Sequence, residues 1–435
     1  MNIMRDICRG SRGMRIAAAS AACAAWMFSS RGAVIAQSAD VSGSAPAVVR
    51  TVEGELSAAR VVSFDPRSGA TVALGDGTRR SIATSDVVSI EFGAGGGREH
   101  ARGWRIRLQN GDEVCGWLTE AVEQSILLDT RDLGPIRIPV EAIGLILTPA
   151  ATEGAMSERV AALERSEATD DVVLLSNGDS VSGFMSRLDH EALVLDGPAG
   201  PQRIAKDVFL AIRLAGERPS PVPRPHFRAE LRASGRLTLE TFLLEQGAAR
   251  GLTTFGEEVR FDAGRIASVS VVGGRWQPLD ELEPISATHV PMLTLDRPHR
   301  RGSNVVGGAL RVGGREYAQG IGVQSRSVLT FDLGGGVYES FVASFGIDDS
   351  AAPEGDVSVR IVVDGAVRYS QDHVRPGRLY GPVRVELRGA RKAGGAEGAS
   401  SESSPAAQLQ LIVDFGDNGD IGDRLNWIEP ALIRR

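Results

Sequence analysis

The chain has 435 residues, of which 52 are Gly and 5% are aromatic. This composition is typical of short strands joined by tight turns and argues against a helical bundle. The formal net charge is -7 with scattered Arg residues, which excludes a broad basic surface for nucleic acid. The length allows two or more domains, each with its own core.

The first 38 residues have the pattern of an export signal. Arg5, Arg9, Arg12 and Arg15 precede an apolar run over 16–28 that is too short to span a bilayer. Small residues surround the expected cleavage point, so the mature chain is expected to begin near Ala39. We therefore expect a secreted or periplasmic protein that is not integral to a membrane.

Three cysteines are present, namely Cys8, Cys23 and Cys115. The first two fall inside the export segment, so the mature chain has one thiol and no internal disulfide. Cys115 lies in an alternating apolar run, which predicts a buried, unreactive thiol.

Four segments with alternating apolar residues and Gly-rich turns follow, at 49–94, 104–149, 171–216 and 228–274. The middle two repeat each other 67 residues apart: residues 106–117 align with 173–184, and 126–129 with 193–196. In both copies Asn-Gly separates two apolar runs, which predicts a tight hairpin whose two turn residues have positive φ. Gly116 and Gly183 interrupt the second strand and predict a bulge or a sharp bend.

Each segment is therefore expected to form a small antiparallel unit of about four or five strands. The units resemble an Sm-like barrel in pattern only, with no nucleic-acid function implied. Duplicated modules of this kind are typical of spacers or of platforms that dock a protein partner.

Composition marks the connections between these segments. Residues 93–97 are Gly-rich and predict a hinge, and alternating prolines at 219–225 predict an extended linker. Met156, Val160 and Leu163 have helical spacing within 153–170. The Gly/Ser/Ala run at 391–406 is expected to be a loop between two strands of the last domain.

Five landmarks occur in a fixed order in residues 276–435. They are Tyr317-Ala318-Gln319-Gly320-Ile321-Gly322-Val323, Leu329 to Gly335, Phe345 to Asp349, Ile361 to Gly365, and Asp423 to Pro430. In this order they resemble the NPCBM family of carbohydrate-binding modules. The resemblance implies a jelly-roll-like β-sandwich that binds a glycan and performs no chemistry. The family often has His where this chain has Gln324, and Gln can exchange hydrogen bonds but cannot titrate.

The candidate carbohydrate-binding residues are Gln324, Asp348, Asp349 and Trp427. An indole ring beside carboxylates suits the apolar face and the hydroxyls of a sugar. A place for Trp427 in the core fits the sequence equally well. Asp348 and Asp349 are neighbours on a strand and should point to opposite faces, so turn formation or a ligand contact is favoured over catalysis.

Acidic residues recur in the run from Asp414 to Asp423, which is rich in Gly and oxygen ligands. Asp417, Asp420 and Asp423 are the candidate metal ligands, and calcium is the cation that suits them. The same residues are ordinary turn formers, and the spacing differs from that of an EF-hand. No other cofactor is indicated.

The sequence thus predicts an exported all-β protein with tandem small antiparallel β units and a C-terminal β-sandwich. The resemblance implies glycan binding, and the lack of a nucleophile elbow, a phosphate loop or a paired His motif argues against catalysis. The alternative is a structural or interaction protein whose repeats dock a partner and whose sandwich has no sugar site.

Overall fold

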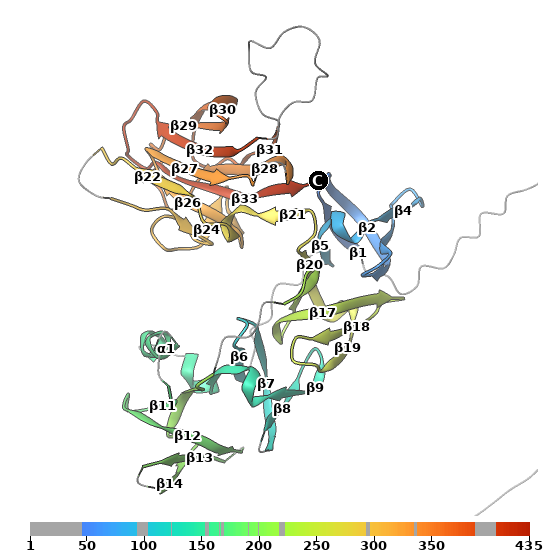
Figure 1. Cartoon of the computed structure of the whole chain (residues 1–435), viewed down its shortest axis with the longest axis vertical. Coiled ribbons are helices and arrows are strands. Elements are labelled where there is room, and N and C mark those ends of the chain that lie inside the picture. Colours follow the sequence, from blue (N-terminus) through green and yellow to red (C-terminus); the bar gives the residue numbers. More distant parts are fainter. Residues whose placement is uncertain are drawn as a thin grey trace, which may run out of the picture. The chain divides into compact units, whose positions relative to one another are not determined.

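A computed structural model of the chain describes a set of separate ranges: residues 46–93, 103–122, 124–152, 156–164, 166, 169–189, 191–198, 200–216, 222–292, 296–334, 337–387 and 406–435. The expected export segment lies outside these residues. So do most of the expected hinge, the first part of the Pro-rich linker and the run at 391–405. Among the described residues the structure has 33 strands and one α-helix (Figure 1), which confirms the all-β fold.

The first small unit has five strands and a short 3₁₀ helix. They are β1 (Pro46–Thr51), β2 (Gly54–Asp65), β3 (Gly69–Ala73), β4 (Arg79–Ile82), η1 (Thr84–Asp86) and β5 (Val87–Phe92). Strands β1 to β4 form an antiparallel meander, and β5 returns to pair with β1. The long β2 pairs with β1 at one end and β3 at the other, so the sheet is small and strongly bent.

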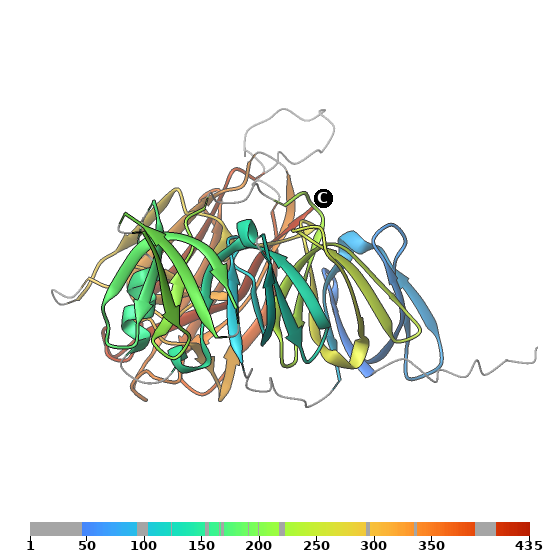
Figure 2. The ribbon, with the colours of Figure 1, turned by 90° about the horizontal axis from the view of Figure 1, so that it is seen from below.

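The next three units repeat this order of strands, and Figure 2 shows the four units as small bent sheets in blue, teal, green and olive. The second unit contains β6 (Trp104–Leu108), β7 (Glu113–Val122), β8 (Ser125–Thr130), β9 (Gly134–Pro139), η2 (Val140–Ala142) and β10 (Ile143–Leu147). The third contains β11 (Asp171–Leu175), β12 (Ser180–Leu188), β13 (Ala192–Gly197), β14 (Gly200–Ala205) and β15 (Phe209–Arg213). The fourth contains β16 (His226–Leu231), β17 (Gly235–Glu245), β18 (Ala248–Thr253), β19 (Glu258–Asp262), η4 (Ala263–Arg265) and β20 (Ile266–Val272).

The Asn-Gly hairpins are present, but their turn differs from the expected one. Only the glycines have positive φ, at 86° for Gly111 and 91° for Gly178. The Gly111 N–H donates to Leu108 O, and Leu108 N–H donates to Asp112 O. This is a longer hairpin loop in which one left-handed residue follows an ordinary turn, so Asn110 does not need positive φ.

The glycine of the second strand lies where that strand changes its partner, which confirms the expected bend. In β7, residues up to Gly116 pair with β6, and those from Trp117 pair with β8. A Cβ atom at Gly116 would lie 2.4 Å from Asp129 O, and one at Gly183 would lie 2.7 Å from Asp196 O. The absence of a side chain therefore lets the next strand approach closely at the bend.

The last strands of the units pair in a nested order, and β17 of the fourth unit pairs in addition with β2 of the first unit and β7 of the second. The second and third units join where β10 pairs with β15, and Ile146 faces Ile212. The first and fourth join where β5 pairs with β20, and Ile90 faces Val269. The two central copies therefore join through the same strand of each copy, in antiparallel orientation. The alternation of apolar residues along the sequence does not predict this pairing.

The expected helix is present as α1 (Met156–Glu164), after the 3₁₀ helix η3 (Pro149–Thr152). Val160 and Leu163 are buried in a cluster with Leu145, Leu174 and Leu210. Cys115 is also buried, as expected, and burial raises the pKa of its thiol to about 12. In the part of the chain that the structure describes, no helix is long and apolar enough to cross a membrane.

The last part of the chain is a two-sheet sandwich. One sheet contains β21 (Trp276–Pro278), β23 (Arg300–Arg301), β26 (Gly320–Gln324), β28 (Tyr338–Ile347), β31 (Tyr380–Glu386) and β33 (Arg424–Arg434). The other contains β22 (Ser286–His289), β27 (Ser327–Asp332), β29 (Val357–Val363), β30 (Ala366–Val374) and β32 (Gln408–Phe415). The 3₁₀ helix η5 (Leu279–Glu281) follows β21, and β24 (Leu310–Val312) and β25 (Arg315–Tyr317) form a separate hairpin.

The two sheets enclose one apolar core, as expected for a β-sandwich. Leu411 and Val413 of β32 and Phe341 and Phe345 of β28 are among its buried residues. Within the two sheets β33 lies between β26 and β28, and β32 lies between β27 and β29. The last two strands of the chain are therefore central to the sandwich.

Candidate functional site

The landmark residues of the sandwich meet in three neighbouring strands. Trp427 on β33 faces Ile321 on β26 and Phe345 on β28. Its ring centroid lies 5.5 Å from that of Phe345, and the residue is 0% exposed. The structure therefore places Trp427 in the core. No face of the indole is open, so a sugar ring cannot stack on it.

Asp348 is likewise buried, at the centre of a hydrogen-bond network. It accepts hydrogen bonds from Asn304 Nδ2 at 3.2 Å, from Asn426 Nδ2 at 2.6 Å, and from both the N–H and the hydroxyl of Ser350. Burial opposes its ionisation, but these hydrogen bonds prevail, so the pKa of Asp348 lies below its ordinary value. Its oxygens are occupied by protein donors and hold the Asn304 loop against β33.

Asp349 and Gln324 lie apart from each other. Asp349 is exposed and accepts hydrogen bonds from the N–H groups of Gly313 and Gly314 at 2.9 and 2.8 Å. Gln324 is 8% exposed, and its Nε2 donates to Asp420 O at 3.1 Å. The structure therefore does not gather the four expected sugar-contacting residues at one place, and only Gln324 adjoins the acidic loop at 416–423.

The three acidic residues expected to bind a metal are also separated. Asp423 is buried, and its two oxygens accept from Ser325 Oγ at 2.7 Å and from Asp356 N–H at 3.0 Å. Asp420 contributes its backbone carbonyl to Gln324. Only Asp417 belongs to a group of side chains with ligand atoms close together, and its neighbours there are Asp356 and His373.

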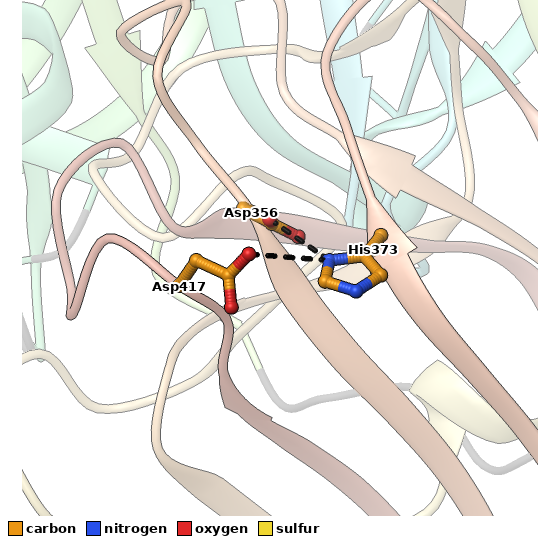
Figure 3. A group of neighbouring side chains, drawn as sticks. All are labelled: Asp356, His373 and Asp417. Atoms are coloured by element: carbon orange, nitrogen blue, oxygen red, sulfur yellow. Dashed lines mark hydrogen bonds and ion pairs between the residues drawn. The ribbon is translucent and has the colours of Figure 1, made fainter.

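The register of three strands brings these side chains together. Val357 at the start of β29 faces Val374 on β30 and Phe415 on β32. Asp356 precedes Val357, His373 precedes Val374, and Asp417 follows Phe415 by two residues, so all three lie at the same end of this sheet. Figure 3 shows the three side chains directed toward one another.

This group, which we call the His373 cluster, consists of Asp356, His373 and Asp417. One ligand atom from each lies within 4.8 Å of the others. His373 Nδ1 is 3.1 Å from Asp356 Oδ2 and 3.9 Å from Asp417 Oδ2. His373 and Asp417 are exposed, whereas Asp356 is 2% exposed. The cluster is therefore an open site with one buried carboxylate at its base.

Negative charge is concentrated around this base. Burial raises the pKa of Asp423 to about 6, and the charges of Asp356 and Asp420 act in the same direction. The hydrogen bond with Asp356 raises the pKa of His373, and the charges of Asp356 and Asp417 add to it. Asp356 Oδ1 is buried with no hydrogen-bond partner among the described residues, which is costly for a carboxylate oxygen. Arg375 Nη2 lies 3.5 Å from Asp356 Oδ2 and supplies one positive charge, while Asp417 is exposed on the open side of the cluster, where a cation could be held beside Asp356 Oδ1.

Sequence reasoning identified Asp417 but missed Asp356 and His373. They are 17 residues apart, before the first strand and near the end of the second strand of one hairpin, and Asp417 follows 44 residues later. No spacing rule links such positions. The one available signal was the alignment of β29, β30 and β32, which requires knowledge of the sheet order.

A two-sheet sandwich is the architecture that the resemblance to a carbohydrate-binding module implied. Residues 276–394 match the family model of the NPCBM/NEW2 domain, so the C-terminal region contains a domain of this type. The match ends before β32 and β33, although both strands are central to the sheets. No curated protein matches the chain.

Several solved structures are similar to this chain. One is the CBM51 module from Clostridium perfringens GH95 in complex with methyl-galactose, with 19% identity, 36% of this chain and 99% of that chain covered, and a TM-score of 0.28. Another is the CBM51-2 module with INT domains from Clostridium perfringens ZmpB, in complex with GlcNAc. It has 20% identity and a TM-score of 0.29, with 45% of this chain covered, and this chain spans 37% of its length.

A third similar structure is the tandem CBM51 modules of Sp3GH98, a family 98 glycoside hydrolase from Streptococcus pneumoniae. The identity is 14% and the TM-score 0.29, with 86% of this chain and 93% of that chain covered. Identities at this level concern the fold only.

Proposed function

We propose that the protein is an exported, non-catalytic carbohydrate-binding protein whose C-terminal sandwich recognises a glycan. The match of residues 276–394 to the NPCBM/NEW2 domain carries this proposal. Asp348 and Asp349 do not form a catalytic pair in it, because one is buried and fully hydrogen-bonded whereas the other is exposed.

The end of the sandwich that carries the acidic loop at 416–423 is the part that suits a sugar. It combines Gln324 and the His373 cluster with the exposed apolar side chains of Met292 and Ile421, which are 62% and 59% exposed. Met292 Sδ lies close to the backbone of Gly419 in the acidic loop. Apolar surface beside convergent donors and acceptors matches the two kinds of surface on a sugar ring.

The first test is a glycan array probed with the purified chain. We expect binding to at least one glycan, and a loss of about tenfold or more in affinity for His373→Ala, because a polar contact to the ligand is removed. Glu386→Gln on the exposed side of β31 is the matched control and should bind as the wild type does. An array with no bound glycan would instead favour a structural protein whose repeats dock a partner.

Export is the second part of the proposal, and the basic and apolar pattern of residues 1–38 supports it. Mass spectrometry of the protein isolated from its native source should find an N-terminus near Ala39. Recovery of intact Met1, or of a lipid on Cys23, would contradict secretion by this route.

We infer further that the His373 cluster holds a divalent cation. Its buried carboxylate, the unpartnered Asp356 Oδ1 and the open face support a bound cation. Two carboxylates and an imidazole suit Zn²⁺ or Mn²⁺ better than Ca²⁺, which takes six to eight oxygen ligands. Thermal unfolding with and without the cation is the measurement.

A further inference from the structure

The two central units expose an aromatic side chain at the same position. Trp117 is 58% exposed and Phe184 is 68% exposed, and the two occupy matching places in the repeat. Each follows the glycine at the bend of its long strand. The matching place in β17 of the fourth unit is held by Glu240, a charged residue of the kind usual on an exposed strand.

The neighbours of the two rings are duplicated as well. Residues directly opposite one another in adjacent strands share a face of the sheet. The two rows of opposite residues, which we call the aromatic faces, are Trp117, Asp129 and Pro135 on β7 to β9, and Phe184, Asp196 and Pro201 on β12 to β14. All six side chains are exposed.

An arginine completes each face. Arg137 lies one row further along, opposite Leu127, and Arg203 lies opposite Val194. Each face therefore offers an apolar ring, a carboxylate acceptor and a guanidinium donor. A single exposed aromatic residue is ordinary, but the same set of side chains at two matching places is a constructed surface.

We propose that the two aromatic faces bind a neutral polysaccharide, with one sugar ring stacked on Trp117 and another on Phe184. The C–H face of a sugar packs on an aromatic ring, while its hydroxyls donate to a carboxylate and accept from a guanidinium. Because each face carries both charges, a polyhydroxyl ligand without charge suits it best. This site is separate from the sandwich and does not depend on the function proposed for it.

A protein partner fits these faces less well. Protein interfaces are built around a contiguous apolar centre that excludes water, whereas each ring here lies opposite an Asp, with Pro and Arg on the strand beyond it. Two rings held on rigid strands of paired units instead suit a repeating ligand, because binding at one face raises the effective concentration at the other.

The test is native affinity electrophoresis of the full chain in gels that contain hydroxyethyl cellulose, β-1,3-glucan, xylan or galactomannan. We expect at least one polymer to retard the wild type. Trp117→Ala and Phe184→Ala should each weaken that binding about tenfold, since each removes a stacking surface. The double variant should migrate as it does without polymer, and Trp117→Phe should retain most of the binding.

Two controls separate this site from its alternatives. Glu240→Ala, at the matching place of the fourth unit, should leave retardation unchanged, and so should His373→Ala in the sandwich. The proposal is overturned if no polymer retards the wild type, or if the double variant is retarded as strongly. It is also overturned if light scattering finds a wild-type dimer that Trp117→Ala converts to monomer, which would assign the faces to self-association.

Discussion

Replacing Trp427 with alanine is expected to lower the free energy of unfolding of the sandwich by about 3–5 kcal/mol. The indole is 0% exposed, lies against Phe345 and belongs to the apolar core between the two sheets. Removing it leaves a cavity that strands fixed on both sides by backbone hydrogen bonds cannot close. The corresponding unfolding transition in differential scanning calorimetry should fall by roughly 10 °C.

Trp117→Ala is the matched control, because it makes the same chemical change on an exposed strand. Its transition should stay within about 0.5 kcal/mol of the wild type. If Trp427→Ala instead melted like the wild type and lost glycan binding, the indole would have to reach the ligand in another conformation, and the core assignment would fail.

The order of the landmarks predicted the sandwich correctly but not the role of each landmark. Trp427 follows an acidic loop, so a ligand-stacking role and a core role fit the sequence equally well. The structure separates them because Leu425, Asn426, Trp427 and Ile428 are all buried. A strand that is buried on both faces does not alternate apolar with polar residues. The second face of β33 is covered by the β24–β25 hairpin, where Leu310 and Val312 pack with Ile428.

Gly322 shows how a landmark residue serves the fold. A Cβ atom at this position would lie 2.4 Å from Val305 N and 2.5 Å from Asn304 C. The glycine therefore admits the loop that carries Asn304, whose amide donates to Asp348. The Gly-Ile-Gly motif is thus explained by close backbone approach, which a sequence shows as a glycine without showing what approaches it.

The repeats were predictable in their strands, because apolar alternation and Asn-Gly turns are local signals. Their nested pairing was not, since the contact of Ile146 with Ile212 depends on which edges meet. The same limit applies to the His373 cluster, whose members come from three chain segments. Local patterns indicate elements, whereas sites that span strands depend on the sheet order.

A divalent cation is expected to stabilise the sandwich through the His373 cluster. A ligand present at about 100 times its dissociation constant adds about 2.7 kcal/mol, which corresponds to a rise of roughly 5–10 °C in a domain of this size. The measurement is the melting temperature of chelator-treated protein with added Zn²⁺, Mn²⁺ or Ca²⁺. We expect the rise to be larger with Zn²⁺ or Mn²⁺ than with Ca²⁺, because His373 supplies a nitrogen ligand.

The dependence of this rise on pH distinguishes the site from nonspecific binding. Burial raises the pKa of Asp423 from 3.8 to about 6, so the folded metal-free protein holds a proton that the unfolded chain has released. Its stability should therefore fall as pH increases from about 4 to about 6. A cation at Asp356 offsets the negative charge that causes part of this loss, and metal binding also requires neutral His373. The cation-induced rise in melting temperature should therefore increase with pH as Asp423 and His373 lose their protons.

Variants of the cluster identify the side chains that hold the cation. His373→Ala and Asp417→Asn should each reduce the cation-induced rise to near zero. Asp417→Asn should change the metal-free melting temperature little, because its side chain is exposed. His373→Ala should lower the metal-free melting temperature, because the buried Asp356 loses a hydrogen-bond partner. Asp423→Asn should remove the fall in stability between about pH 4 and 6, because an amide cannot release a proton there. Glu386→Gln, remote on β31, should keep both behaviours. An equal rise in His373→Ala and in the wild type would place the cation elsewhere, and no rise with any of the three ions would leave the cluster as a salt bridge between His373 and its two carboxylates.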